Sequence, residues 1–296
     1  MTAFSSSLPT PPPTSRPWLF PLGMLLPGGL ATCVLVLFAL AIVLMLGFRI
    51  NDGSLLGDGF TLSNLASAVS DPLYALVLLR SLAIAGLVTL ATVVTAYPVA
   101  HYLAFHAGPR RGLLLFLVTL PFWTSYLLRV FAWKIVLAYN GVLNSALLGT
   151  GLTSEPILAF LNTPAAVVVT LAHAYAAFAI LPIYVALETI PRSLLEAASD
   201  LGARPFARFR RVVLPLSMPG VLSAALVVFV PTVGDYVTPA LVGGPSSTMI
   251  GSIIQAQFGK ANDWPFGAAV STLVMLVIAA VILLVALASR RFGGRR

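Results

Sequence analysis

The sequence predicts an all-α membrane protein with six transmembrane helices, and two observations carry that prediction. Of the 296 residues, 59% are hydrophobic and 9% are charged, whereas a typical soluble domain carries about 25% charged residues. Apolar stretches repeatedly reach the roughly 20 residues that a helix needs to cross a hydrocarbon core about 30 Å thick. The ten-residue alternation of a barrel strand is absent, so helices are the form that satisfies the backbone in lipid.

We expect one transmembrane domain over residues 18–296, preceded by a flexible tail at 1–17. The tail contains LPTPPPTSRP, which is too rich in proline and polar residues to pack. The apolar run that follows is too long for a signal peptide and is interpreted as an uncleaved first span. The expected spans are about 24–47, 77–100, 113–137, 165–187, 219–242 and 265–289.

The positive charge is placed as membrane topology requires, so it does not indicate nucleic-acid binding. The net charge is +8, and most arginines fall before the first span, after the last span or in the loops at 101–112 and 188–218. The opposite loops carry several acidic residues, namely Asp52, Asp58, Asp71, Glu155 and Asp263. Because arginine and lysine mark the cytoplasmic side, we expect both termini in the cytoplasm.

No internal repeat is visible, and the residues offer little for other kinds of chemistry. Six spans without duplicated halves suggest half of a transport pathway, the rest coming from a second subunit. Cys33 is the single cysteine and cannot form an intrachain disulfide. No Cys, His and Asp cluster has the spacing of a metal site, and no GxSxG elbow or catalytic carboxylate pair is present.

The largest charge cluster lies in LLEAASDLGARPFARFRRVVLPLSMPGV, residues 194–221. Ser193 and Glu196 have the spacing of a capping box, and Gly202 is a typical left-handed helix end, so a helix is expected from Leu194 to Leu201. This helix has one apolar face, and at eight residues it needs something to pack against.

A second helix is expected after Gly202, and a break before span five. Arg204 and Pro205 suit the first turn of a helix, and Pro215 and Pro219 are expected to interrupt the chain, with Ser217 as a cap. Together the two expected helices form an elbow that projects into the cytoplasm. Two interpretations of this elbow stay open: it is a solvated loop whose arginines set the orientation in the membrane, or its helix binds in a groove of a partner protein.

Several tracts resemble the permeases of bacterial ABC importers. Glu196-Ala197-Ala198, Gly202, Val212 and Leu214-Pro215 are similar to the EAA loop of that superfamily, which usually has isoleucine at the position of Val212. Further tracts, from roughly residue 75 to 289, resemble the spermidine/putrescine branch of the binding-protein-dependent transport inner membrane component family: LPFWTSYLLRVFAW, NGVLNSALL, PIYVALETI, FVPTVGDYVTPALVGGPSSTMIG and DWPFGAA.

The resemblance implies a type I importer of the bacterial inner membrane. In such an importer the chain pairs with a second permease, two cytoplasmic ATPase subunits and a periplasmic solute-binding protein. The EAA loop, here 188–218, carries a coupling helix that docks on the ATPase; its matching residues are Glu196, Ala197, Ala198, Asp200 and Gly202. The chain itself would be no enzyme and would bind no cofactor, because ATP and magnesium belong to the ATPase; it contains no GxxxxGK[ST] loop.

Asp235 is the first candidate for substrate contact. Ionisable groups inside membrane spans are costly and are functional candidates by default. Asp235 follows Pro231 and Gly234, which can break span five as discontinuous helices break near binding sites. Its carboxylate would suit a cationic amine, or it pairs with Arg129 or Lys134 of span three; both alternatives stay open. Arg129 is itself expected to belong to the substrate pathway, since it is part of the pattern that resembles the polyamine branch.

Aromatic residues would complete a path for cations, because ring faces attract ammonium groups. The candidates are Trp123, Tyr126, Trp133, Tyr184 and Tyr236. For each of them, packing or contact with lipid is the competing interpretation. His173 is expected to be a packed, hydrogen-bonded histidine, and Glu188 to have a structural or exit-side role.

The sequence therefore predicts a permease subunit for polyamines, with two alternatives. The same architecture could import another small organic solute, such as an amino-acid derivative, an opine-like compound or a phosphonate. An ion-driven secondary transporter is the other alternative, but it leaves the EAA pattern unexplained and is expected to have duplicated halves.

Overall fold

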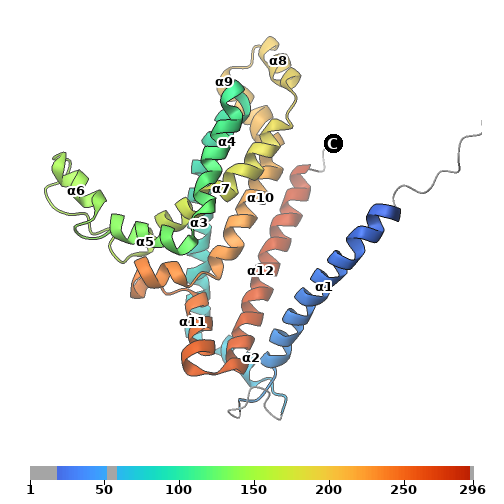
Figure 1. Cartoon of the computed structure of the whole chain (residues 1–296), viewed down its shortest axis with the longest axis vertical. Coiled ribbons are helices and arrows are strands. Elements are labelled where there is room, and N and C mark those ends of the chain that lie inside the picture. Colours follow the sequence, from blue (N-terminus) through green and yellow to red (C-terminus); the bar gives the residue numbers. More distant parts are fainter. Residues whose placement is uncertain (1–18, 52–58, 294–296) are drawn as a thin grey trace, which may run out of the picture.

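The computed structural model describes residues 19–51 and 59–293, and in this part of the chain it is built almost entirely of helices. The tail predicted at 1–17 lies outside the described residues. The five long helices are α1 (Leu19–Gly47), α3 (Pro72–Phe105), α7 (Pro164–Glu188), α10 (Leu214–Val233) and α12 (Trp264–Gly293). Helices α3, α7, α10 and α12 form a bundle, and α1 approaches α12 at one end and diverges from it toward the other (Figure 1). Each contains a stretch long and apolar enough to cross a membrane, and a bent helix pair supplies a sixth candidate. Six spans were predicted, and the first, second, fourth and sixth lie within α1, α3, α7 and α12.

The core lies where α3, α7 and α10 pack together. Small residues let these helices approach closely, as is usual for helices packed in membranes. Gly220 of α10 shows this most clearly, because a Cβ at this position would overlap the side chain of Ala186 and the carbonyl oxygen of Pro182 in α7. The close contact between α7 and α10 therefore requires glycine here.

We expect Gly220→Val to destabilise the protein by about 1–3 kcal/mol, because the added carbons must push α10 away from α7. Thermal unfolding of the purified protein in detergent would measure this as a lower melting temperature. Gly86→Val is the matched control, since a Cβ at Gly86 of α3 would meet no atom within 4 Å. Equal loss of stability in both variants would contradict the close-packing explanation.

A second, smaller hydrophobic cluster joins the N-terminal halves of α3 and α12 to two short helices, α2 (Ser63–Ser70) and α11 (Ile250–Ala256). Here the backbone N–H of Ile250 donates to the Ser81 hydroxyl at 2.7 Å, and Ile250 is buried. The start of α11 is thereby fixed to α3. This cluster lies at the end of the molecule opposite to α8 (Arg192–Asp200) (Figure 1).

The prediction of one continuous third span over 113–137 was wrong. The segment consists of α4 (Arg111–Thr119), a 3₁₀ turn (Leu120–Trp123) and α5 (Tyr126–Val136), and its two halves meet at 89°. The break falls at Thr124 and Ser125, whose backbones are extended with ψ angles of 146° and 135°. Pro121 contributes, because proline lacks the N–H that would continue the helix. The second half, α5, forms an arm together with α6 (Val142–Gly149), and this arm projects from the bundle (Figure 1).

The predicted break at Pro215 and Pro219 was also wrong. The helix runs without interruption from Pro205 to Val233, through α9 (Pro205–Arg208), a wide π turn (Phe209–Val213) and α10. The wide turn ends at Val213, two residues before Pro215, and relieves the crowding that a proline causes with the preceding turn of a regular helix. Ser217 is no helix cap; it is buried, and its hydroxyl lies 2.8 Å from the hydroxyl of Tyr97 in α3. The fifth span thus begins well before residue 219.

Span five ends earlier than residue 242, at the break expected after Pro231. Helix α10 stops at Val233, Gly234 is its C-cap, and a short π-helical segment (Pro239–Gly243) follows the break. Residues 234–236 are therefore non-helical backbone inside an apolar stretch. Such backbone is tolerated in a membrane where it is buried in protein or lines a cavity.

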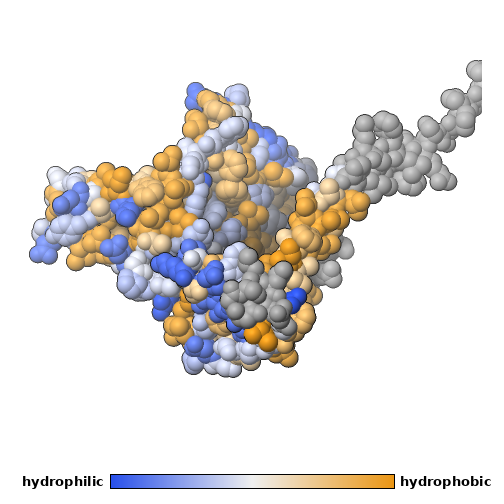
Figure 2. Space-filling view, turned by 60° about the horizontal axis from the view of Figure 1, so that its bottom comes forward, coloured by the Kyte–Doolittle hydropathy of each residue, from blue (hydrophilic) through white to orange (hydrophobic). Residues whose placement is uncertain are grey.

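Hydrophobic side chains cover much of the outer surface. Figure 2 shows them over the projecting arm and along α1. Many residues there are exposed in the isolated chain, for example Leu35, Phe38, Phe122 and Leu128. This is the surface expected of a chain surrounded by lipid and by other membrane subunits.

Candidate functional site

Asp235 lies in the break of the fifth span and is almost fully buried, with 8% of its surface exposed. Its Oδ1 accepts a hydrogen bond from the backbone N–H of Val237 at 3.0 Å, so the side chain caps the turn that follows the break. Its Oδ2 accepts a hydrogen bond from the Tyr126 hydroxyl at 2.7 Å. The carboxylate is therefore held by neutral groups from two elements.

Tyr126 brings α5 to this break. It is the first residue of α5, directly after the 89° bend, and its hydroxyl also lies 2.6 Å from the Thr238 hydroxyl. Thr238 is fully buried. The ring of Tyr175 in α7 lies 6.5 Å from that of Tyr126. The bend in span three thus places a phenol against a carboxylate more than a hundred residues away in the sequence.

The structure does not pair Asp235 with a basic residue. Arg129 of α5 donates instead to the carbonyl oxygen of Ala174 in α7, at 2.7 Å. Within residues 19–51 and 59–293, the one ion pair joins Arg111 to Glu188, so Asp235 forms none with Arg129 or Lys134. A buried carboxylate without a direct ion pair has lost hydration that a hydrogen bond to a phenol replaces only in part. This arrangement favours a site for a cation.

Tyr236 lines an open hollow next to Asp235. The hollow measures about 480 Å³ and is lined by Gly234, Tyr236, Gly251, Ile254, Gln255, Phe258 and Gly259. Tyr236 is 47% exposed, and Gln255, which lines the same hollow, is exposed as well. A hollow with two aromatic rings, one amide and several glycines suits an extended chain that carries amino groups.

The other predicted aromatic residues lie apart from Asp235. Trp123 is 82% exposed on the 3₁₀ turn before the bend. The Trp133 indole donates to His173 Nδ1 at 3.1 Å, so the expected hydrogen bond of His173 is confirmed, but the residue is exposed and not packed as predicted. Tyr184 is buried against Arg111, near the end of α7 that leads to α8. Sequence reasoning missed Thr238 and Tyr175; the spacing of Thr238, three residues after Asp235, was the available signal.

The elbow has the predicted C-terminal end but not the predicted start. Helix α8 runs from Arg192 to Asp200, its N-cap is Pro191, and no side chain caps it, so the capping box of Ser193 and Glu196 was wrong. Proline supplies extended backbone that can start the helix without a side-chain bond. Gly202 ends α8 with φ +78°, and the Ala203 N–H donates to the Ala198 carbonyl at 3.0 Å, as in a Schellman motif.

The elbow is closed by hydrogen bonds and still presents apolar side chains outward. Arg208 of α9 donates to the Ser199 hydroxyl at 2.7 Å, and Ser199 donates to the Leu195 carbonyl at 2.8 Å. Leu194 is 45% exposed and Leu201 is 88% exposed. An ordered protrusion with exposed leucines fits contact with another protein.

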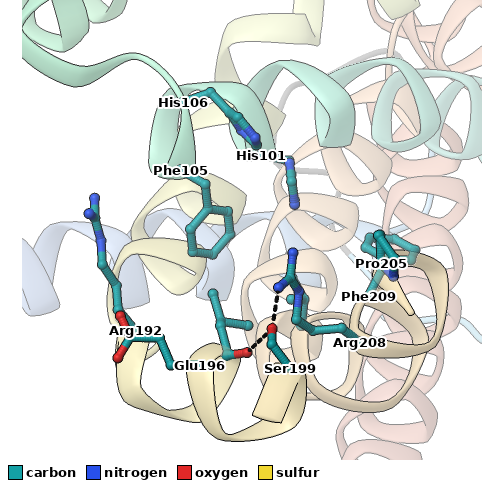
Figure 3. Close-up of a pocket in the computed structure, with 11 residues that line it drawn as sticks. His101, Phe105, His106, Arg192, Glu196, Ser199, Pro205, Arg208 and Phe209 are labelled. Carbon is teal, nitrogen blue, oxygen red and sulfur yellow. Dashed lines mark hydrogen bonds between the residues drawn. The ribbon is translucent and has the colours of Figure 1, made fainter. Parts of the chain in front are cut away.

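A hollow of about 480 Å³ lies between the elbow and the end of α3. Figure 3 shows His101, Phe105 and His106 on one side and residues of α8 and α9 on the other. The remaining lining residues are Arg192, Leu195, Glu196, Ser199, Pro205, Arg208, Phe209 and Val213. The coupling residues predicted from the sequence lie close together in the chain: Glu196, Ala197, Ala198 and Asp200 are in α8, and Gly202 follows the end of the helix. Of these, Glu196 lines the hollow.

Comparison with known families gives the class of protein to which these features belong. Residues 30–293 match the family of binding-protein-dependent transport system inner membrane components, and the chain belongs to this family. It is thus a multi-pass protein of an inner membrane and a permease subunit of a binding-protein-dependent transporter.

Two bacterial transport proteins are similar to this chain over most of its length. The chain is 40% identical over 248 residues to the spermidine/putrescine transport system permease protein PotB of Haemophilus influenzae, covering 83% of this chain and 86% of that protein. It is 41% identical over 240 residues to PotB of Escherichia coli K12, covering 81% and 86%.

The fold also resembles a solved transporter. The crystal structure of a bacterial alginate ABC transporter, in complex with a periplasmic protein bound to alginate pentasaccharide, contains a chain similar to this one with a TM-score of 0.70. The match covers 93% of this chain and 95% of that chain at 17% identity, and it shows the fold alone. The predicted fold, a type I ABC importer transmembrane domain, is confirmed.

Proposed function

We propose that this protein is the permease subunit of an ATP-driven importer of polyamines, such as spermidine and putrescine, and that it forms half of the translocation pathway. The observation that carries the proposal is the buried Asp235 carboxylate, which lies in a broken membrane helix and has neutral partners only. The names of the PotB relatives support the same substrate class.

The geometry around Asp235 supports binding and release of a polyamine. An ammonium group that approaches Asp235 would form the direct ion pair that the carboxylate lacks within the described residues, and Tyr126 would keep the carboxylate in place. The ring of Tyr236 beside it offers a face to the alkyl chain or to a second ammonium group. Since the site also has hydrogen bonds of its own without the cation, binding would stay weak enough for release.

In this proposal the chain works in a complex. A second permease supplies the other half of the pathway, a periplasmic solute-binding protein delivers the substrate, and two ATPase subunits bind ATP and magnesium. This chain would bind no cofactor and catalyse no reaction. The exposed elbow supports the position of the ATPase, with Glu196, Ala197, Ala198, Asp200 and Gly202 at the contact. Both termini would then lie in the cytoplasm, on the side of the arginine-rich loops.

Uptake by the complete transporter tests the function. In proteoliposomes that contain the transporter and its binding protein, we expect ATP-dependent accumulation of labelled putrescine or spermidine, competed by the other polyamine. A transporter without the binding protein is the control and should accumulate neither. Accumulation of an anionic or uncharged solute, with no accumulation of either polyamine, would overturn the substrate assignment.

A further inference from the structure

An ion pair joins the start of α4 to the end of α7. Arg111 is the first residue of α4, and its guanidinium donates to the Glu188 carboxylate at the end of α7. The Arg111 Cζ also lies 5.0 Å from the centre of the Tyr184 ring, one turn before Glu188. Tyr184 is buried, so the guanidinium rests on a fixed part of α7. The proposed function leaves this arrangement unused.

Each partner of the pair leads directly to a functional region. Glu188 is separated from α8, the elbow helix, by residues 189–191 only. Arg111 begins α4, and the chain then passes through the 3₁₀ turn and the 89° bend to Tyr126, whose hydroxyl bonds to Asp235. The ion pair therefore connects the segment that enters the elbow with the segment that ends at the candidate substrate site.

Helix α4 has few buried contacts, so a displacement of Glu188 could move it through the ion pair. None of its side chains is buried, and it contacts the core through partly buried residues, namely Leu114, Leu115 and Val118. Helices with few buried contacts are the ones that shift in conformational changes. A polar contact at the first residue of α4 can then decide where the helix lies.

We propose that the Arg111–Glu188 pair carries movement of the elbow to α4 and thereby positions Tyr126 against Asp235. The two residues are positioning residues, because neither contacts the candidate site. The proposal rests on the proposed function in one respect: it takes the elbow to be the part that the ATPase moves. Coupling between distant positions requires a direct test by paired substitutions.

Charge reversal of each partner and of both provides this test. We expect Arg111→Glu and Glu188→Arg, each alone, to lower the amount of putrescine imported per ATP hydrolysed by about tenfold. The double variant restores the pair in the opposite order and should recover to within about twofold of the unaltered protein. Both side chains are partly exposed, at 37% and 42%, so the exchange creates no buried charge. Failure of the double variant to recover would overturn the proposal.

Arg110→Glu is the matched control. Arg110 is exposed next to Arg111 and forms no ion pair with any described residue, so the same change of charge there should leave the import ratio unaltered. If the reversed variants do not assemble, Arg111→Gln and Glu188→Gln remove the pair without repulsion. An unaltered import ratio in the glutamine variants would count against the proposal.

A distance measurement separates this proposal from the identity of the substrate. Spin labels on Ser125→Cys and Val227→Cys, in a Cys33→Ser background, report movement of the bend relative to α10; Cys33 is the single cysteine of the chain. In the complete transporter, ATP with vanadate should change this distance in the unaltered protein and in the double variant, but not in either single variant. A change that persists in the single variants would overturn the proposal. A pair-dependent change without putrescine uptake would support it and contradict only the substrate assignment.

Discussion

Asp235→Asn is expected to reduce polyamine uptake by at least about tenfold while the transporter still assembles. Asparagine keeps the shape of the side chain, and its oxygen can still accept from the Val237 N–H or the Tyr126 hydroxyl. What it loses is the negative charge that would meet an ammonium group. The loss of a hydrogen-bonded charge pair in a buried site costs about 2 kcal/mol or more, and about 1.4 kcal/mol corresponds to a factor of ten.

Initial rates of labelled putrescine uptake at several concentrations would measure this effect, together with the yield of the purified complex. Asp71→Asn is the matched control. Asp71 accepts from the Leu73 N–H at 2.8 Å at the start of α3, a role that asparagine also fills. Uptake kinetics of Asp235→Asn that match those of the control would exclude Asp235 from the substrate path.

Glu196→Lys is expected to abolish most ATP-driven uptake, by about tenfold or more, while the chain remains inserted in the membrane. Glu196 is exposed on α8 and has no ion-pair partner within the described part of the chain, so its replacement disturbs little inside the protein. The physical reason for the loss is repulsion at a contact with the ATPase that is arranged for a negative charge.

Two measurements are needed for this variant: uptake in proteoliposomes and stimulation of ATP hydrolysis by the loaded binding protein. We expect both to fall together and the amount of co-purified ATPase to decrease. Glu155→Lys is the control, because Glu155 is also exposed but lies in the loop before α7, on the opposite side of the predicted membrane. Normal uptake with normal ATPase content in Glu196→Lys would exclude a docking role for this residue.

Local features of the chain were predictable because their causes are local. Gly202 adopts a left-handed conformation that glycine tolerates without strain, and it ends α8 as expected. The break after Val233 follows from Pro231 and Gly234, which stand close together in the sequence. The start of α8 was missed because Pro191 supplies the extended backbone there, and the serine and glutamate of a capping box can match by spacing without forming it.

The errors in spans three and five have one common origin. A run of apolar residues reports that a segment prefers lipid or protein to water, but it says nothing of the direction that the segment takes. The bend at Thr124 and Ser125 depends on where α5 finds partners, namely Tyr126 with Asp235 and Arg129 with the carbonyl of Ala174. The helix that continues through Pro215 depends on a π turn that no residue pattern indicated.

By itself, the sequence determined that this chain crosses a membrane several times, that an amphipathic helix ends at Gly202, and that Pro231 and Gly234 break the fifth span beside the carboxylate of Asp235. Hydropathy, charge placement and the backbone freedom of glycine and proline decide these features, and all three are properties of neighbouring residues. Only the tertiary structure decided which groups meet: Tyr126 with Asp235, Arg129 with a backbone carbonyl, and Arg111 with Glu188. Such contacts join residues far apart in the chain, and they follow from the packing of whole helices, in which many interactions compete at once.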